Sequence, residues 1–195
     1  MKVFALLCFC PIFFGCVTNR IISENDLNTT LQPENDKWMV LCLSPVNDFR
    51  TSLENEIQKE LQFHNVHSQT SHQQLPEPLL QSNDIHKRLM HLVQSLEEKN
   101  FSMLLISALN STEETNVNAE GHFGEYTLYH YQTNLYALKD GESILEWSMC
   151  LCIYDYQLSQ ISVANFARAI VWKMAEDQVI PLNIYEPIEY YTLLK

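Results

Sequence analysis

The hydrophobic positions divide the chain beyond residue 37 into buried strands and amphipathic helices. Continuous apolar runs at 38–43 and 101–109 are bounded by polar residues, which is typical of strands that are buried on both faces. Apolar residues recur at helical spacing in 49–61, 85–96 and 163–174. Each of these three ranges therefore predicts an amphipathic helix.

The pattern changes in the second half of the chain and predicts a long antiparallel hairpin. Lys139-Asp140-Gly141-Glu142 separates two runs that are rich in β-branched and aromatic residues. Asp-Gly in such a setting is a strong signal for a two-residue hairpin turn. The arms are predicted at 126–138 and 143–154, the polar stretch 110–124 is predicted to be an exposed loop, and a short strand fits 66–70.

The order of these elements is β-α-(β)-α-β-β-β-α, which favours the α/β (α+β) class. We expect a single domain over 38–195, with a mixed β-sheet and helices that form further layers on it. The strands at 38–43 and 101–109 are predicted to be parallel, because a right-handed crossover joins such strands.

The N-terminus has the layout of a bacterial export signal. Lys2 precedes an apolar run over 3–14, and Gly15-Cys16 follows it. The run is too short to span a bilayer, which needs about 20 apolar residues. This layout resembles a bacterial lipoprotein precursor, and the resemblance implies that 1–15 is a removed signal peptide and that Cys16 carries diacylglycerol and an acyl group such as palmitate. The alternative is an ordinary secretory signal, with Cys16 unmodified.

The same resemblance predicts where the chain is held. Val17 follows the cysteine, and no Asp stands there to retain the protein in the inner membrane. We therefore expect lipid anchoring at the outer membrane, on its periplasmic face. Residues 16–37 are rich in Asn, Thr and Glu, and they read as a lipidated N-terminus followed by a flexible tether.

The acidic balance of the chain disfavours nucleic-acid binding. The chain carries 24 acidic against 12 basic residues, for a formal net charge of -12. Such a surface repels phosphate backbones and anionic headgroups, so the lipid has to supply membrane attachment. The acidic residues are scattered, as on a solvated surface.

A second resemblance rests on two short motifs in the second half of the chain. They are the hairpin sequence Asp-Gly-Glu-Ser-Ile-Leu-Glu-Trp at 140–147 and the tail Gln-Val-Ile-Pro at 178–181. Both motifs are similar to those of outer-membrane lipoproteins of the curli-secretion and penicillin-binding-protein-activator type. Those proteins share an α/β domain related to the N-terminal domain of TolB. The resemblance implies a lipoprotein of the cell envelope with this α/β domain.

The sequence offers little support for a metal or catalytic site. His64, His67 and His72 have spacing that zinc could use, but the segment lacks a nearby cysteine and a His-Glu-x-x-His pattern. His86 and His91 are about 140° apart on a helix, which is unsuitable for paired ligands. A nucleophile elbow and a phosphate-binding loop are also missing. We therefore predict no metal, no cofactor and no catalytic residue.

Three cysteines lie beyond the N-terminal segment, at Cys42, Cys150 and Cys152. Cys150 and Cys152 are predicted to point to one face of a strand and to be poorly placed to bridge each other. A bridge from Cys42 to either stays open, as does a reactive cysteine paired with a distant histidine. Buried free thiols are the favoured interpretation.

Aromatic residues of the hairpin form the candidate binding patch. Tyr129, Tyr131 and Trp147 share odd numbers on neighbouring strands, which predicts a contact surface for a protein or glycan. Packing under a helix is the equally good alternative. We therefore expect a non-catalytic envelope protein that binds a partner protein. The alternative is a periplasmic enzyme or small-ligand carrier whose site is invisible in the sequence.

Overall fold

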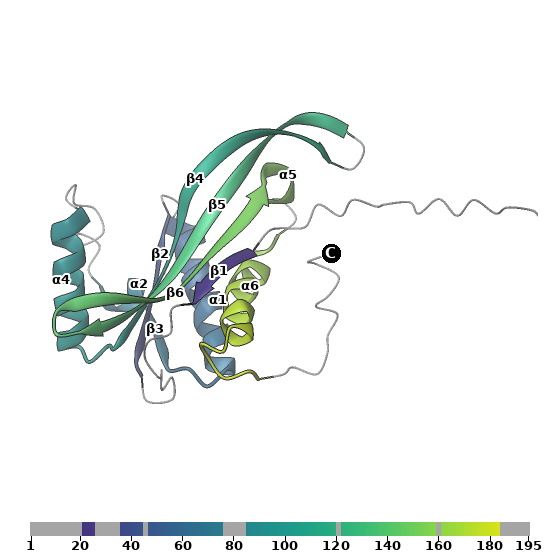
Figure 1. Ribbon diagram of the computed structural model, residues 1–195. Coiled ribbons are helices and arrows are strands. Elements are labelled where there is room, and N and C mark those ends of the chain that lie inside the picture. Colours follow the sequence, from purple (N-terminus) through teal and green to yellow (C-terminus); the bar gives the residue numbers. More distant parts are fainter. Residues whose placement is uncertain are drawn as a thin grey trace, which may run out of the picture.

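The computed structural model describes residues 21–25, 36–44, 47–75, 85–119, 122–158 and 161–183. Their strands form one six-stranded mixed sheet in the order β1-β6-β5-β4-β2-β3 (Figure 1). The strands are β1 (Ile21–Asn25), β2 (Trp38–Leu43), β3 (Ser68–Thr70), β4 (Met103–Ala119), β5 (His122–Lys139) and β6 (Glu142–Tyr154). The helices are α1 (Asn47–Phe63), α2 (Ser71–Gln74), α4 (Ile85–Glu98), α5 (Asp155–Leu158) and α6 (Val163–Glu176). The predicted α+β class is confirmed.

The sheet joins a parallel part to an antiparallel part. β2 lies between β3 and β4 and is parallel to both, with Trp38 opposite Ser68 on one side and Met103 on the other. This confirms the predicted parallel pairing of the two apolar runs. β4, β5 and β6 then form an antiparallel meander, and β1 adds to the edge of β6.

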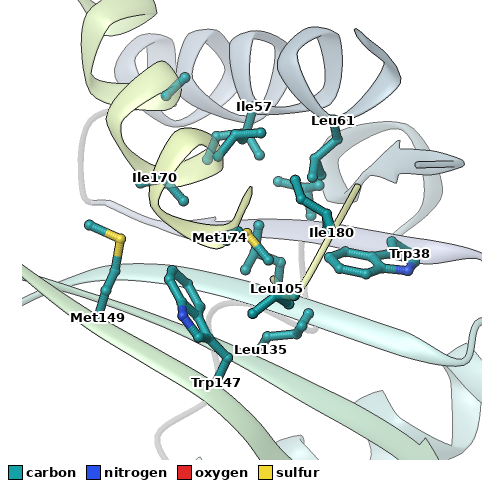
Figure 2. Packing of buried hydrophobic residues seen from close by; sticks show 14 of the residues in the cluster. Trp38, Ile57, Leu61, Leu105, Leu135, Trp147, Met149, Ile170, Met174 and Ile180 are labelled. Atoms are coloured by element: carbon teal, nitrogen blue, oxygen red, sulfur yellow. The ribbon is translucent and has the colours of Figure 1, made fainter. Parts of the chain in front are cut away.

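One face of the sheet packs against α1 and α6. Alternate residues of the strands meet apolar residues that lie at helical spacing on both helices (Figure 2). Large and fully buried members of this cluster are Trp38, Leu53, Ile57, Leu61, Leu105, Leu135, Trp147, Met149 and Ile153. Burial of each such side chain contributes about 1.5–3 kcal/mol, so this cluster is a principal source of stability.

The opposite face is covered in part by α4. Leu92 and Leu96 of this helix are buried in one cluster with Met39, Leu41 and Leu104 of the sheet. β2 is therefore buried on both faces, as its continuous apolar run predicts. The domain has three layers, with α1 and α6 on one side of the sheet and α4 on the other (Figure 1).

The predicted hairpin turn is confirmed. Lys139 pairs with Glu142, and the two residues between them have positive φ angles, 55° at Asp140 and 81° at Gly141. Two consecutive residues with positive φ are the mark of a type I′ turn, whose twist matches that of the strands it joins.

The predicted exposed loop at 110–124 is wrong. β4 continues to Ala119 and β5 begins at His122, so the two strands stay paired almost to their connection. The ladder shifts by one residue between Leu109 and Ser111, where a β-bulge interrupts β4. This part of β4 is mostly polar and shows no alternation of apolar and polar residues, which is the usual signal of a strand.

The predicted tether at 16–37 is also wrong in part. Ile21–Asn25 forms β1, which pairs antiparallel with β6, and Ile21 lies opposite Leu151. A strand of 5 residues at a sheet edge contains too few apolar positions to show a period. The predicted signal peptide and Cys16 lie outside the described residues. The short helices α2 and α5 were not predicted.

Candidate functional site

The predicted aromatic patch lies on the sheet face that α6 covers. Trp147 is only 1% exposed, and its Nε1–H donates a hydrogen bond to Oδ2 of Asp177 at 2.8 Å. Tyr131 is half-buried and meets the Phe166 ring edge-on at 5.0 Å between centroids, and Tyr129 is also half-buried. The prediction that Trp147 belongs to a contact surface is therefore wrong, because its side chain is buried. The alternative of packing under a helix describes Trp147 and Tyr131.

A small pocket opens beside these aromatic rings. Tyr131, Ile153, Phe166 and Ser162 are among its lining residues, and its volume is about 50 Å³. Pockets for small-molecule ligands usually have volumes of about 300–1,000 Å³. This pocket is therefore too small to hold a substrate or a carried ligand.

The three histidines proposed as zinc ligands lie in three different surroundings. His64 is buried, and its Nδ1 lies 2.8 Å from the carbonyl oxygen of Pro181. His67 is exposed, whereas Nδ1 of His72 lies 3.0 Å from Oε2 of Glu54. His64 and His72 thus have structural partners, and the structure does not bring the three rings together as one ligand set.

A buried carboxylate joins three elements near the end of β2. Glu54 of α1 is 0% exposed, and its Oε1 accepts hydrogen bonds from the Cys42 backbone N–H at 3.0 Å and the Ser71 hydroxyl at 2.6 Å. Its Oε2 accepts from the His72 backbone N–H at 3.2 Å. Buried carboxylates need such partners, so Glu54 holds β2, α1 and α2 together.

The Cys42 thiol is buried beside this carboxylate and is inert. Burial raises the pKa of Cys42 to about 12, and the charge of Glu54 adds to the rise. The thiolate is the nucleophilic form of cysteine, and a pKa this high leaves almost none of it at neutral pH. Cys42 is free, so the bridge to Cys150 or Cys152 is not formed.

A line of polar side chains crosses β5 and β6 on the face opposite α6. The Asn134 Nδ2 group donates to the Tyr136 hydroxyl at 3.0 Å, and the Ser148 hydroxyl donates to Asn134 Oδ1 at 3.0 Å. The amide of Gln132 donates to the same Asn134 oxygen at 3.0 Å. Figure 1 shows α4 near the β5–β6 turn and not over the middle of these strands, so solvent reaches the half-buried polar line.

His130, Cys150 and Cys152 continue this line, and together they form the candidate site. Nδ1 of His130 lies 3.3 Å from the Cys152 sulfur and 3.9 Å from the Cys150 sulfur. The two sulfur atoms are 3.9 Å apart. Nε2 of His130 points the other way and lies 3.7 Å from Oε2 of Glu113. One imidazole nitrogen therefore faces two thiols, and the other faces a carboxylate.

This placement corrects one prediction and confirms another. Cys150 and Cys152 do share a strand face, as predicted, but they are half-buried on the side away from the α1–α6 core. Burial raises the pKa of Cys150 to about 11, and the adjacent Cys152 adds to the rise. The alternation of Trp147, Met149 and Leu151 toward the core is the signal that places both thiols on the opposite face.

Comparisons with known proteins find similarity among solved structures only. No family model and no curated protein matches the sequence. Among solved structures, the PelC dodecamer from Paraburkholderia phytofirmans matches at 12% identity and a TM-score of 0.48, over 81% of this chain and 95% of that chain. The lipoprotein GNA1162 from Neisseria meningitidis matches at 10% identity and a TM-score of 0.40, over 74% and 98%. At these values, the similarity assigns neither family nor function.

Among the helices of the described ranges, none is both long and apolar enough to cross a bilayer.

Proposed function

We propose that this chain is a non-catalytic protein of the bacterial cell envelope that binds a partner protein. In this proposal, lipid on Cys16 holds the protein at the periplasmic face of the outer membrane. The basic start, the short apolar run over 3–14 and Gly15-Cys16 support the anchor, and Val17 supports the outer membrane. Several acyl chains are needed for stable anchoring, and lipoprotein processing provides them.

The observation that carries the binding proposal is a two-stranded ribbon that extends past the sheet. β6 pairs with β5 only as far as Leu128, which lies opposite Tyr154, and β2 pairs with β4 only as far as Ala108. Beyond these points, residues 114–119 of β4 pair with residues 122–127 of β5, and no further described strand pairs with either. We call these two segments the ribbon (Figure 1).

A ribbon of this kind is suited to docking. Two strands without a third partner or a covering layer are at best marginally stable in water. Their outer edges present backbone N–H and C=O groups, which another chain can pair with by adding a strand. The base of the ribbon is fixed, because the backbone N–H of Thr127 donates to Oδ2 of Asp155 at 3.2 Å and Tyr126 contacts the Tyr156 ring at 5.1 Å.

The charge of the ribbon indicates the surface it fits. Glu114 and Glu125 are exposed on its two strands, and Glu113 is exposed at its base. These carboxylates favour a partner with basic side chains around its docking edge, because complementary charge speeds encounter and fixes the register of pairing. They also discourage the ribbon from pairing with a second copy of itself.

The chemistry of the described residues supports a non-catalytic role. A pKa raised by burial to about 12 keeps the Cys42 thiol protonated at neutral pH. The Glu54 carboxylate, which lies against His72, is 0% exposed and already accepts hydrogen bonds from the residues around it. It has no access to a substrate.

The proposal is tested by photo-crosslinking in intact envelopes. A photoreactive residue is placed at Glu114 or Glu125 on the ribbon, or at the exposed Lys59 on α1 as the control. We expect discrete adducts with a second polypeptide from both ribbon positions and none from Lys59. Adducts from Lys59 alone, or none from a correctly localised ribbon variant, would contradict partner binding through the ribbon.

A further inference from the structure

We infer that His130, Cys150 and Cys152 form a binding site for one Zn²⁺ ion, in which Nδ1 and the two sulfur atoms are the ligands. This inference is independent of the proposed partner binding, because it rests on the half-buried face of the sheet and not on the ribbon. The three ligand atoms lie within 4.8 Å of one another. Imidazole and thiolate are the ligands that Zn²⁺ prefers in proteins.

Strand geometry brings the three side chains to one place. Cys150 and Cys152 are two residues apart on β6, so they point to the same face of the sheet. His130 lies directly opposite Cys152 on β5. All three positions are in paired strands, so their backbone is held rigidly, as a preorganised site requires.

The separations of the ligand atoms match those of a tetrahedral zinc site. With Zn–S distances of about 2.3 Å and Zn–N of about 2.05 Å, tetrahedral angles place two sulfurs about 3.8 Å apart and sulfur and nitrogen about 3.6 Å apart. The observed separations are 3.9 Å between the sulfurs and 3.3 and 3.9 Å from Nδ1 to Cys152 and Cys150. Shifts of a few tenths of an ångström would therefore complete the geometry.

The second nitrogen of the histidine has the partner that a metal-bound histidine usually has. Nε2 of His130 lies 3.7 Å from a carboxylate oxygen of Glu113. When Nδ1 binds the metal, Nε2 carries the proton and is directed at this carboxylate. The 3.7 Å separation exceeds hydrogen-bond distance, so Glu113 would fix the tautomer and strengthen the ligand only after its exposed side chain moves a few tenths of an ångström closer.

Binding needs no oxidant or reductant. Each thiol loses its proton to solvent, the hydrated ion releases the waters that the three protein ligands replace, two Zn–S bonds and one Zn–N bond form, and zinc stays in oxidation state +2. Three protein ligands leave the fourth position to water or to an incoming group, as in zinc sites that are not closed. The neighbouring Gln132 lies opposite Cys150, but its amide is hydrogen-bonded to Asn134 and Ser148.

The test uses the full-length protein, purified in detergent under reducing conditions and stripped of metal. Zn²⁺ is titrated in competition with a chromophoric chelator, and Co²⁺ is titrated separately as a spectroscopic substitute. We expect the wild type to bind one more equivalent of Zn²⁺ than the His130→Ala/Cys150→Ser/Cys152→Ser variant. With Co²⁺, we expect a thiolate charge-transfer band and the intense visible bands of a tetrahedral site.

Single variants and matched controls assign the ligands. Cys150→Ser and Cys152→Ser should each lower the affinity more than about 100-fold, and Glu113→Gln should lower it by about 10-fold or less, because the exposed Glu113 lies 3.7 Å from Nε2. Cys42→Ala and His67→Ala remove a thiol and an imidazole elsewhere and should bind as the wild type does. Whether or not residues 1–15 are removed, the cysteines at 8, 10 and 16 are in the same state in every variant, so they do not contribute to the differences. Circular dichroism identifies any variant that fails to fold.

Three results would overturn the inference. The first is equal zinc binding by the wild type and a folded triple variant. The second is a site that Cu⁺ fills and Zn²⁺ does not, which would assign another metal. The third is a Cys150–Cys152 disulfide in protein isolated from envelopes without reductant, detected as the loss of two hydrogen masses, since oxidised sulfurs cannot bind the ion.

Discussion

Replacing Glu54 should be the most destabilising single change of a charged residue in this domain. The side chain is 0% exposed and accepts hydrogen bonds from Cys42 N–H, the Ser71 hydroxyl and His72 N–H at 3.0, 2.6 and 3.2 Å. Glu54→Ala removes the acceptor from all three donors at once. The joint between β2, α1 and α2 would then lose its central contact.

The size of the effect follows from the burial of the donors. A buried donor without an acceptor costs about 1–3 kcal/mol. Cys42 and Ser71 are buried, whereas His72 is half-buried, so water can reach its backbone N–H once the carboxylate is gone. Two fully buried donors and the lost packing give an expected loss of about 3–5 kcal/mol in the free energy of unfolding. That is a large share of the 5–15 kcal/mol typical of a domain.

Glu54→Gln separates hydrogen bonding from packing. The amide keeps one oxygen for Cys42 and Ser71, but it turns an NH₂ group toward the N–H of His72. We expect a smaller loss, about 1–2 kcal/mol. The control is Glu56→Ala on the same helix, which removes a surface ion pair with Lys59 and should cost under about 1 kcal/mol.

The assay is urea unfolding of each variant, followed by tryptophan fluorescence and far-UV circular dichroism. Trp38 and Trp147 are fully buried in the core, so their emission reports on its loss. A Glu54→Ala variant that loses less than about 1 kcal/mol, or no more than Glu56→Ala, would refute the structural role of the carboxylate.

Three further predictions concern the thiols, the turn and the anchor. Burial raises the pKa of Cys42 from 9.0 to about 12, so its thiolate at pH 8 is about 1,000-fold scarcer than that of an ordinary cysteine. The rate of iodoacetamide labelling of Cys42 should therefore rise with pH up to about 12. Rapid labelling of native Cys42 at pH 8, seen by peptide mass spectrometry, would disprove this. Gly141→Ala places a side chain at a φ of 81°, where L-residues are strained, although no atom lies within 4 Å of the new methyl group. The variant should lower the free energy of unfolding by about 1–2 kcal/mol, measured by thermal unfolding. Cys16→Ser should abolish incorporation of radiolabelled palmitate and release the protein into the periplasm, and unchanged membrane fractionation would count against lipidation.

The sequence predicted the elements that border a core and missed those that do not. The helices at 47–63, 85–98 and 163–176 and the strand at 38–43 carry apolar residues at the period of their secondary structure. β1 has only 5 residues, and residues 114–119 of the ribbon are mostly polar, so neither segment has enough apolar positions to show a period. Their pairing is set by backbone hydrogen bonds and by neighbours distant in the sequence, which a local pattern does not record.

The candidate site was missed for a more specific reason. Counting back from the turn, where Lys139 pairs with Glu142, a regular hairpin would place His130 opposite Leu151 and away from Cys152. The register shifts between Leu135 and Tyr136, so His130 instead lies opposite Cys152. Bulges leave no reliable mark in a single sequence, yet one extra residue moves every later side chain to the other face.

The central claim, partner binding through the ribbon, is tested most directly by the mass of the native complex. A variant in which Asn-Gly replaces residues 114–127 keeps the last complete pairs, because Glu113 lies opposite Leu128 and Leu128 opposite Tyr154. Both proteins are extracted from envelopes in mild detergent and measured by native mass spectrometry. The account predicts a complex with a second polypeptide for the wild type and a free, lipidated monomer for the variant. The same state for both folded proteins, either both free or both in a complex with the second polypeptide, would contradict it.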